Sequence, residues 1–317
     1  MKRRFPLKYK VLMLTLVLGV ISAGIWWLMA SFTEWRTGIR TVPWAAYQGC
    51  GDQDPAMLPE VVRVGLYEEF PVPWRLDKLQ QVDFPVKLAL AAASREEFLP
   101  IRDSVMATYP QVQEVYFWPL LTLGEGYYPG SWSNADAVER VTREAQGLPV
   151  LWDVEVPRNQ LGLSVQDWWR NMRFVNQWLH ERTEPVNIWR SHAGMGLNPL
   201  FLRLAGMHFD PLDYPAVSLH LDLYMQGEGA PSDVVAKILR CGVERYGQRF
   251  IPSLGVFNDG EGDPAIFIPP ETFRRILTLA RNSGVSEVWL FGVNGFNEEY
   301  LSIVREILPL ASLDEAA

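Results

Sequence analysis

The sequence predicts an α/β fold, a closed (β/α)8 barrel, and three observations support this prediction. Eight short apolar runs rich in β-branched and aromatic residues recur after residue 61, and amphipathic stretches separate several of them. Strands that alternate with helices are parallel, because a helical crossover returns the chain to the same edge of the sheet. Eight such units in about 250 residues match this barrel in number and length. An open doubly wound sheet is the alternative, but no G-x-G-x-x-G motif follows the first strand.

The predicted strands are the apolar runs that end in polar residues: 61–67, 86–92, 114–120, 148–154, 186–190, 216–223, 249–256 and 287–293. Helices are predicted between them at 134–146, 164–182, 232–246 and 270–282. Ser164 precedes Asp167 by three residues, which is an N-cap signature. Pro270 opens the last of these helices and Gly284 follows its end. Glu298 and Glu299 are expected to begin a final helix.

Length and composition are those of a globular protein, since 48% of the 317 residues are hydrophobic and 21% are charged. The 24 glycines and 23 prolines follow no repeat, which excludes collagen-like and low-complexity chains. Two cysteines are too few for a disulfide scaffold or a multi-cysteine zinc module. The net charge is −8, and five of the basic residues lie within the first ten positions, so the body of the chain is more acidic still. No nucleic-acid partner is therefore expected.

Residues 11–32 form an uncharged apolar run that is predicted to be a transmembrane signal anchor. As a helix the run reaches about 33 Å, which is enough to cross a bilayer core of ~30 Å. The basic segment 1–10 places the N-terminus in the cytoplasm, and the rest of the chain then lies in the periplasm or outside the cell. A cleaved signal peptide is the alternative, although the run is long for one and Leu28 is large for the −3 position of a cleavage site.

Residues 33–60 are interpreted as a linker or lead-in to a barrel domain at 61–317. Cys50 and Cys241 would both lie outside the cytoplasm, where a disulfide is permitted. Nothing in the sequence places the two cysteines together, so their pairing stays open.

In such barrels, function lies at the carboxyl ends of the strands and in the loops that follow them. Polar, ionisable and aromatic residues gather at these positions. The candidate substrate-binding residues are Glu68, Glu69, Trp118, Tyr127, Tyr128, Trp132, Arg190, His192, His220, Asp222, Tyr224, Asn258 and Asn294. Strand alternation turns only one of Glu68 and Glu69 inward and does not identify which.

Two groups of aromatic residues have different interpretations. Tyr127, Tyr128 and Trp132 lie in a loop rich in Gly, Pro and Ser, where they would hold sugar rings or pack over the barrel mouth as a lid. The other group, Trp168, Trp169 and Trp178, has helical spacing, so these side chains are expected to pack in the helical shell.

Asp153 and Glu155 are the candidate catalytic residues, at the end of the fourth predicted strand. Side chains two positions apart in a strand point the same way, so both carboxylates would project into the barrel mouth. Neighbouring acids separate their pKa values, which leaves one protonated as a general acid and the other charged. Glycosidic cleavage uses such a pair. The alternative is structural: Asp153 caps the following loop, and Glu155 pairs with an arginine.

His220 and Asp222 have the same alternating spacing and would line the substrate pocket, bind a metal, or form a satisfied core pair. A metal site could combine them with Asp153, Glu155 and His192. The chain has only four histidines and no H-x-H or H-E-x-x-H motif, so neither a metal nor another cofactor is expected.

The D-x-E at the end of the fourth strand resembles the chitinase-type glycoside hydrolases, whose signature is D-x-x-D-x-D-x-E. Asp153 and Glu155 occupy the last two acidic positions, while Leu148 and Leu151 occupy the earlier two. Asp222 and Tyr224 are loosely similar to that family's M-x-Y-D segment, and residues 288–291 are similar to its aromatic last strand. The resemblance implies that Glu155 is the acid and Asp153 its neighbour, with the acetamido group of the substrate as nucleophile.

Together these observations predict a membrane-anchored, extracytoplasmic glycoside hydrolase-like enzyme. It would act on a cell-envelope or extracellular carbohydrate by carboxylate general acid/base catalysis. A non-catalytic polysaccharide-binding or assembly barrel is one alternative, and a metal-dependent hydrolase is another.

Overall fold

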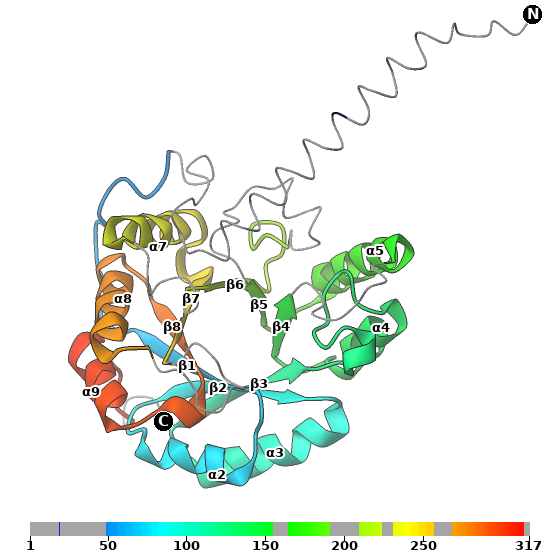
Figure 1. Ribbon diagram of the computed structural model, residues 1–317, viewed down its shortest axis with the longest axis horizontal. Coiled ribbons are helices and arrows are strands. Elements are labelled where there is room, and N and C mark those ends of the chain that lie inside the picture. Colours follow the sequence, from blue (N-terminus) through cyan, green and yellow to red (C-terminus); the bar gives the residue numbers. More distant parts are fainter. Residues whose placement is uncertain are drawn as a thin grey trace, which may run out of the picture. The chain divides into compact units, whose positions relative to one another are not determined.

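The structure, a computed structural model, describes residues 49–154, 164–190, 209–223, 231–256 and 268–313, together with Gly19. Eight parallel strands close into a barrel in their sequence order, which confirms the predicted fold (Figure 1). The strands are β1 (Arg63–Glu68), β2 (Val86–Ala92), β3 (Val112–Pro119), β4 (Val150–Val154), β5 (Val186–Arg190), β6 (Val217–Asp222), β7 (Phe250–Gly255) and β8 (Glu287–Phe291). Each predicted strand lies within two residues of the observed bounds.

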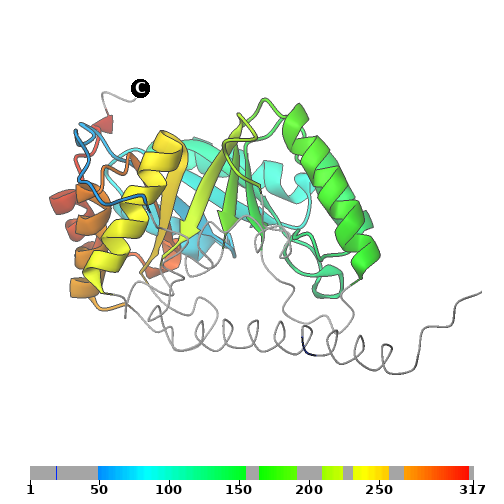
Figure 2. The ribbon, with the colours of Figure 1, turned by 90° about the horizontal axis from the view of Figure 1, so that it is seen from above.

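Helices cover the outside of the barrel (Figures 1 and 2). Those in the described residues are α2 (Pro73–Leu76), α3 (Arg95–Thr108), α4 (Ala135–Glu144), α5 (Val165–Glu181), α7 (Ser232–Tyr246), α8 (Pro270–Asn282) and α9 (Glu298–Ile307). Ser164 caps α5 as predicted, because its side chain accepts a hydrogen bond from the Asp167 amide. Helix α3 was not predicted, since only Phe98 and Val105 of its residues are buried and its apolar pattern is correspondingly weak.

Alternation along the strands separates two apolar layers. One set of side chains faces the helices, as Trp152 does where it contacts Trp178 of α5 at 4.8 Å between ring centroids. The other set fills the barrel, with Trp289 at its centre. Gly65 leaves the space for that ring, because a Cβ at Gly65 would lie 2.1 Å from a carbon of the Trp289 indole.

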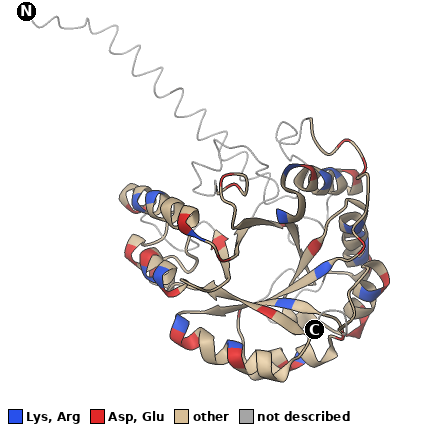
Figure 3. Ribbon diagram, turned by 180° about the vertical axis from the view of Figure 1, so that it is seen from behind, with Lys and Arg blue, Asp and Glu red and all other residues tan. Residues whose placement is uncertain are grey.

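The amino end of the barrel carries a charged layer beneath Trp289. The indole nitrogen of Trp289 donates a 2.7 Å hydrogen bond to Glu287. Glu287 is buried and forms ion pairs with Arg63 at 2.8 Å and with Lys87 at 3.1 Å. The buried carboxylate is therefore compensated by two cations. On the outer helices, acidic and basic residues are intermixed (Figure 3).

A disulfide between Cys50 and Cys241 joins the lead-in to α7, which settles the pairing that the sequence left open. The amide of Gly51 donates to a carboxylate oxygen of Glu244 at 2.9 Å, and Arg240 donates to the Gly51 carbonyl at 2.9 Å. Asp52 pairs with Lys237 at 2.6 Å. Residues 50–52 are therefore bound to the barrel by covalent, polar and ionic contacts.

Within the described residues, no helix has the length and apolar character needed to cross a membrane. The predicted anchor at 11–32 and the basic segment at 1–10 lie outside the described residues, apart from Gly19. Both remain predictions.

Candidate functional site

A hydrogen-bonded group of three side chains joins β1, β6 and β7 inside the barrel. The hydroxyl of Tyr67 lies 2.6 Å from Nδ1 of His220 and 2.6 Å from Oγ of Ser253. All three residues are buried, with at most 1% of their surface exposed. We call them the Tyr67–His220–Ser253 group. Of its members only His220 was predicted, although a lone serine within the apolar run 249–256 was a usable signal.

Burial holds the Tyr67–His220–Ser253 group in its uncharged forms. Burial raises the pKa of Tyr67 well above its ordinary value, and the charges of Asp153, Asp222 and Glu287 raise it further. Burial also lowers the pKa of His220 well below its ordinary value, with Lys87 adding to the effect. The tyrosine therefore keeps its proton at neutral pH while the imidazole stays neutral.

Asp153 and Asp222 approach the same interior region from β4 and β6. Each is nearly inaccessible, at 3% and 1% exposure, and both act electrostatically on Tyr67. Strand alternation places Asp222 on the same face as His220, two residues earlier. Three of the predicted residues thus act on Tyr67: His220 through a hydrogen bond, and Asp153 and Asp222 through their charges.

The structure decides between Glu68 and Glu69. Glu69 lies at the mouth, where Oε1 accepts hydrogen bonds from the hydroxyls of Tyr127 at 2.8 Å and Tyr128 at 3.1 Å. Tyr128 belongs to the interior aromatic cluster that includes Tyr67, so Glu69 is the inward carboxylate. Tyr128 is only 5% exposed, which fits the lid arrangement of this loop more closely than an open sugar platform.

Glu68 has a different environment. Its Oε1 accepts from the Phe70 amide at 2.9 Å and from Arg75 at 3.2 Å. Burial raises the pKa of Glu68 from 4.5 to about 7, although both of these contacts oppose the rise. A small cavity of about 10 Å³ lies beside Glu68 and Glu69, and Asn294 also lines it.

The loop after β3 is tied to α5. Asn171 donates two hydrogen bonds from Nδ2, to the carbonyls of Ser131 at 3.0 Å and Ser133 at 2.7 Å. Between these serines, Trp132 packs on Trp168 with ring centroids 5.8 Å apart. The rim loop is therefore held to the helical shell on one side and to Glu69 on the other.

The remaining predicted residues have different places. Trp118 is buried in the interior, where its ring meets the edges of Tyr67 and Phe291. Arg190 ends β5 opposite Val154 and Leu221. Glu155, His192, Tyr224 and Asn258 lie outside the described residues and remain predictions.

In the part of the chain that the structure describes, no three His, Cys, Asp or Glu side chains are grouped to hold a metal ion. The chemistry available there is that of buried carboxylates beside a neutral tyrosine and histidine. Such groups can donate and accept hydrogen bonds to a polar ligand without introducing positive charge.

Comparisons with known proteins bear on the fold. The chain matches no protein-family model and no curated protein sequence. Among solved structures it is similar to a chitinase from Chromobacterium violaceum ATCC 12472, with a TM-score of 0.50 and 12% identity over 77% of this chain and 98% of that chain. Active domain 2 of a thermostable chitinase from Pyrococcus furiosus gives a TM-score of 0.49 and 11% identity, over 83% and 97%. The similarity to the Chromobacterium violaceum chitinase supports the predicted resemblance at the level of the fold alone.

Proposed function

We propose that this protein is a membrane-anchored, extracytoplasmic glycoside hydrolase-like enzyme that acts on a cell-envelope or extracellular carbohydrate. The observation that carries the proposal is that two buried carboxylates, Asp153 and Asp222, act electrostatically on the buried Tyr67 hydroxyl, which is hydrogen-bonded to His220 and Ser253. A solved chitinase has a similar fold, which adds support.

Glu155 is the proposed general acid. It follows Asp153 by two positions, and strand alternation would turn the two side chains toward the same side. Asp153 and Asp222 then orient the substrate and influence the proton on Glu155, while their charges keep the buried Tyr67 hydroxyl protonated. Glu69 supplies a further carboxylate at the mouth, with Tyr127 and Tyr128 above it.

The proposed location rests on two features. The uncharged run 11–32 follows a basic segment, as in a signal anchor whose N-terminus stays in the cytoplasm. The Cys50–Cys241 disulfide is of the kind that forms and persists in oxidising compartments outside the cytoplasm.

The test is hydrolysis of chitin oligosaccharides, cellulose oligosaccharides and purified peptidoglycan by the full-length protein. Loss of a general acid lowers rates by about 10²–10⁴-fold, so Glu155→Gln should abolish measurable turnover. The same substitution at the exposed Glu60 is the control and should leave the rate unchanged. Activity that survives in Glu155→Gln, or that a chelator removes, would refute the mechanism.

A non-catalytic glycan-binding barrel is a second candidate, and one observation favours it. Leu151 occupies a signature position that carries an acid in chitinase-type enzymes, and it is fully buried in the interior cluster. Glycan binding without turnover, unchanged in Glu155→Gln but lost in Trp132→Ala, would support this second function.

A further inference from the structure

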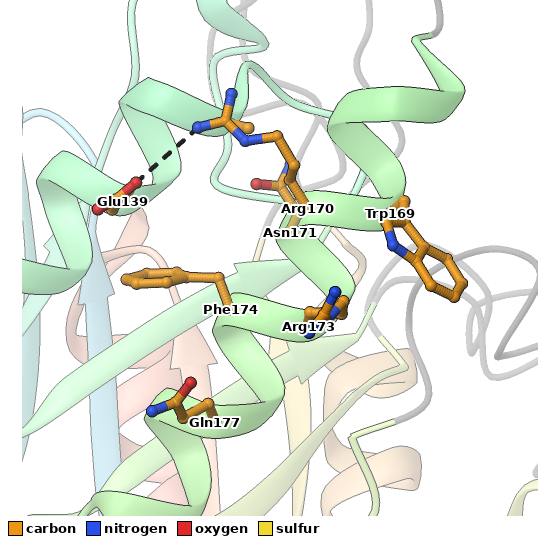
Figure 4. Close-up of a pocket in the computed structure, with 8 residues that line it drawn as sticks. Glu139, Trp169, Arg170, Asn171, Arg173, Phe174 and Gln177 are labelled. Carbon is orange, nitrogen blue, oxygen red and sulfur yellow. Dashed lines mark ion pairs between the residues drawn. The ribbon is translucent and has the colours of Figure 1, made fainter.

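A groove of about 330 Å³ lies between α4 and α5, on the outer side of the barrel (Figure 4). Both helices begin at the mouth end of the barrel, because each follows the carboxyl end of a strand. Phe174 points toward α4, and Arg170 reaches Glu139 across the groove at 3.9 Å (Figure 4). Arg173 and Gln177 lie on the same stretch of α5 and are exposed. The Phe174 ring thus shares the groove with the planar polar groups of glutamate, arginine and glutamine side chains.

Trp169 lies at the edge of this groove, and its indole projects away from Glu139 and Phe174 (Figure 4). The ring is 58% exposed, so the sequence-based expectation that it packs in the shell was wrong. The other two tryptophans of α5, Trp168 and Trp178, are partly buried. Residues 168 and 169 differ by one position, so about 100° of helical turn directs Trp169 outward.

The exposed indole continues a row of rings from the barrel rim. Ring centroids are 5.8 Å apart between Trp132 and Trp168, and 6.4 Å apart between Trp168 and Trp169. Trp132 belongs to the same loop as the two tyrosines that bind Glu69 at the mouth. Asn171, which also lines the groove, anchors that loop. The groove and the candidate site are therefore linked by one anchored loop.

We propose that this groove and the row of tryptophans form a second carbohydrate-binding surface, which holds a polysaccharide chain outside the barrel mouth. The assignment of the ligand class rests on the proposed function. Indole rings offer apolar faces to sugar rings, while Arg173, Gln177 and Glu139 offer hydrogen-bonding groups to sugar hydroxyls. The groove volume is at the lower end of the ~300–1,000 Å³ that is typical of ligand sites.

The charges of the groove favour a hydrated sugar over a protein partner. Arg170 pairs with Asp136 at 2.7 Å, and 45% of its side chain remains exposed. A protein docked on the groove would remove water from these charged groups at a substantial desolvation penalty. Sugar hydroxyls, in contrast, replace the hydrogen bonds that water makes.

The test measures binding of the full-length protein to insoluble chitin, cellulose and purified peptidoglycan. Loss of one aromatic stacking contact should weaken binding to at least one polymer about fivefold in Trp169→Ala, with a smaller loss in Arg173→Ala. Leu212→Ala is the matched control, because Leu212 is also 58% exposed but precedes β6 at the opposite end of the barrel. Absence of binding to all three polymers, or unchanged binding in both variants, would overturn the proposal.

Two further measurements separate this surface from the proposed active site. Turnover of chitotetraose and cellotetraose should be unchanged in Trp169→Ala, and Glu155→Gln should retain polymer binding. Polymer binding that depends on Trp169 in a protein without turnover would refute the proposed activity and leave the second surface standing. Sedimentation measures the oligomeric state, and a dimer that Trp169→Ala converts to a monomer would identify a self-interface and overturn the proposal.

Discussion

Replacing Tyr67 with phenylalanine removes a hydroxyl on β1 that is hydrogen-bonded to both His220 of β6 and Ser253 of β7. The hydroxyl is 2.6 Å from His220 Nδ1 and 2.6 Å from Ser253 Oγ, in a fully buried environment. The ring itself would keep its packing against Trp289, whose centroid is 5.0 Å away. The substitution therefore isolates the polar contribution of the Tyr67–His220–Ser253 group.

The expected loss of folding free energy depends on the polar groups of His220 and Ser253 that the variant leaves without the Tyr67 hydroxyl. Each hydrogen bond contributes about 1 kcal/mol net, and a buried group left without a partner costs about 1–3 kcal/mol. The Ser253 hydroxyl can rotate toward another acceptor. The imidazole of His220 would lose the Tyr67 hydroxyl as the partner of its Nδ1. Within the described residues its Nε2 has no hydrogen-bond partner, so the variant would leave both ring nitrogens unpaired. We expect Tyr67→Phe to lower the free energy of unfolding by about 2–4 kcal/mol.

Urea denaturation of the full-length protein with its disulfide intact measures this loss. Tyr300→Phe is the control, since it removes a buried hydroxyl that donates a 2.7 Å hydrogen bond to the Ile268 carbonyl, and it should cost about 1–2 kcal/mol. A double-mutant cycle with Ser253→Ala should show a coupling of about 1 kcal/mol. If Tyr67→Phe costs no more than Tyr300→Phe, the buried group does not hold the three strands as reasoned here.

Three further predictions concern stability. Because burial raises the pKa of Glu68 from 4.5 to about 7, the free energy of unfolding should fall as the pH rises from about 4.5 to 7. Glu68→Gln should remove that fall, and an unchanged slope would contradict the assignment. Reduction of the Cys50–Cys241 disulfide, whose cysteines are 191 positions apart, should lower stability by up to ~5 kcal/mol in denaturation measured with and without a thiol; equal stabilities would show that the polar contacts suffice. Gly65→Ala would place a Cβ 2.1 Å from Trp289 and should cost at least ~1–3 kcal/mol, whereas a variant with native stability and near-UV circular dichroism would show that the indole can move.

The barrel is predictable from the sequence because its signals are local. Buried parallel strands appear as short apolar runs, and the predicted runs 86–92 and 186–190 match β2 and β5 residue for residue. The N-cap at Ser164 depends only on a neighbour three positions away. Helix α3 has few buried positions and so escaped the periodicity argument.

The candidate site is only partly predictable, because its contacts join residues far apart in the chain. Asp153, His220 and Asp222 were identified from their places at strand ends. Tyr67 and Ser253 were missed, since they are 186 positions apart and only the barrel brings their hydroxyls together. The exposure of Trp169 was missed for another reason: helical spacing alone does not show how much of that face of α5 its neighbours cover.

By itself, the sequence determined the strand pattern, the helix caps and the end of the barrel where polar groups gather, because each depends on residues within a few positions of one another. Tertiary structure alone decided which of Glu68 and Glu69 turns inward, that Cys50 and Cys241 are bonded, and that Tyr67 joins His220 and Ser253. The physical reason is closure of the barrel: the register between distant strands sets which side chains meet, and no local pattern encodes that register.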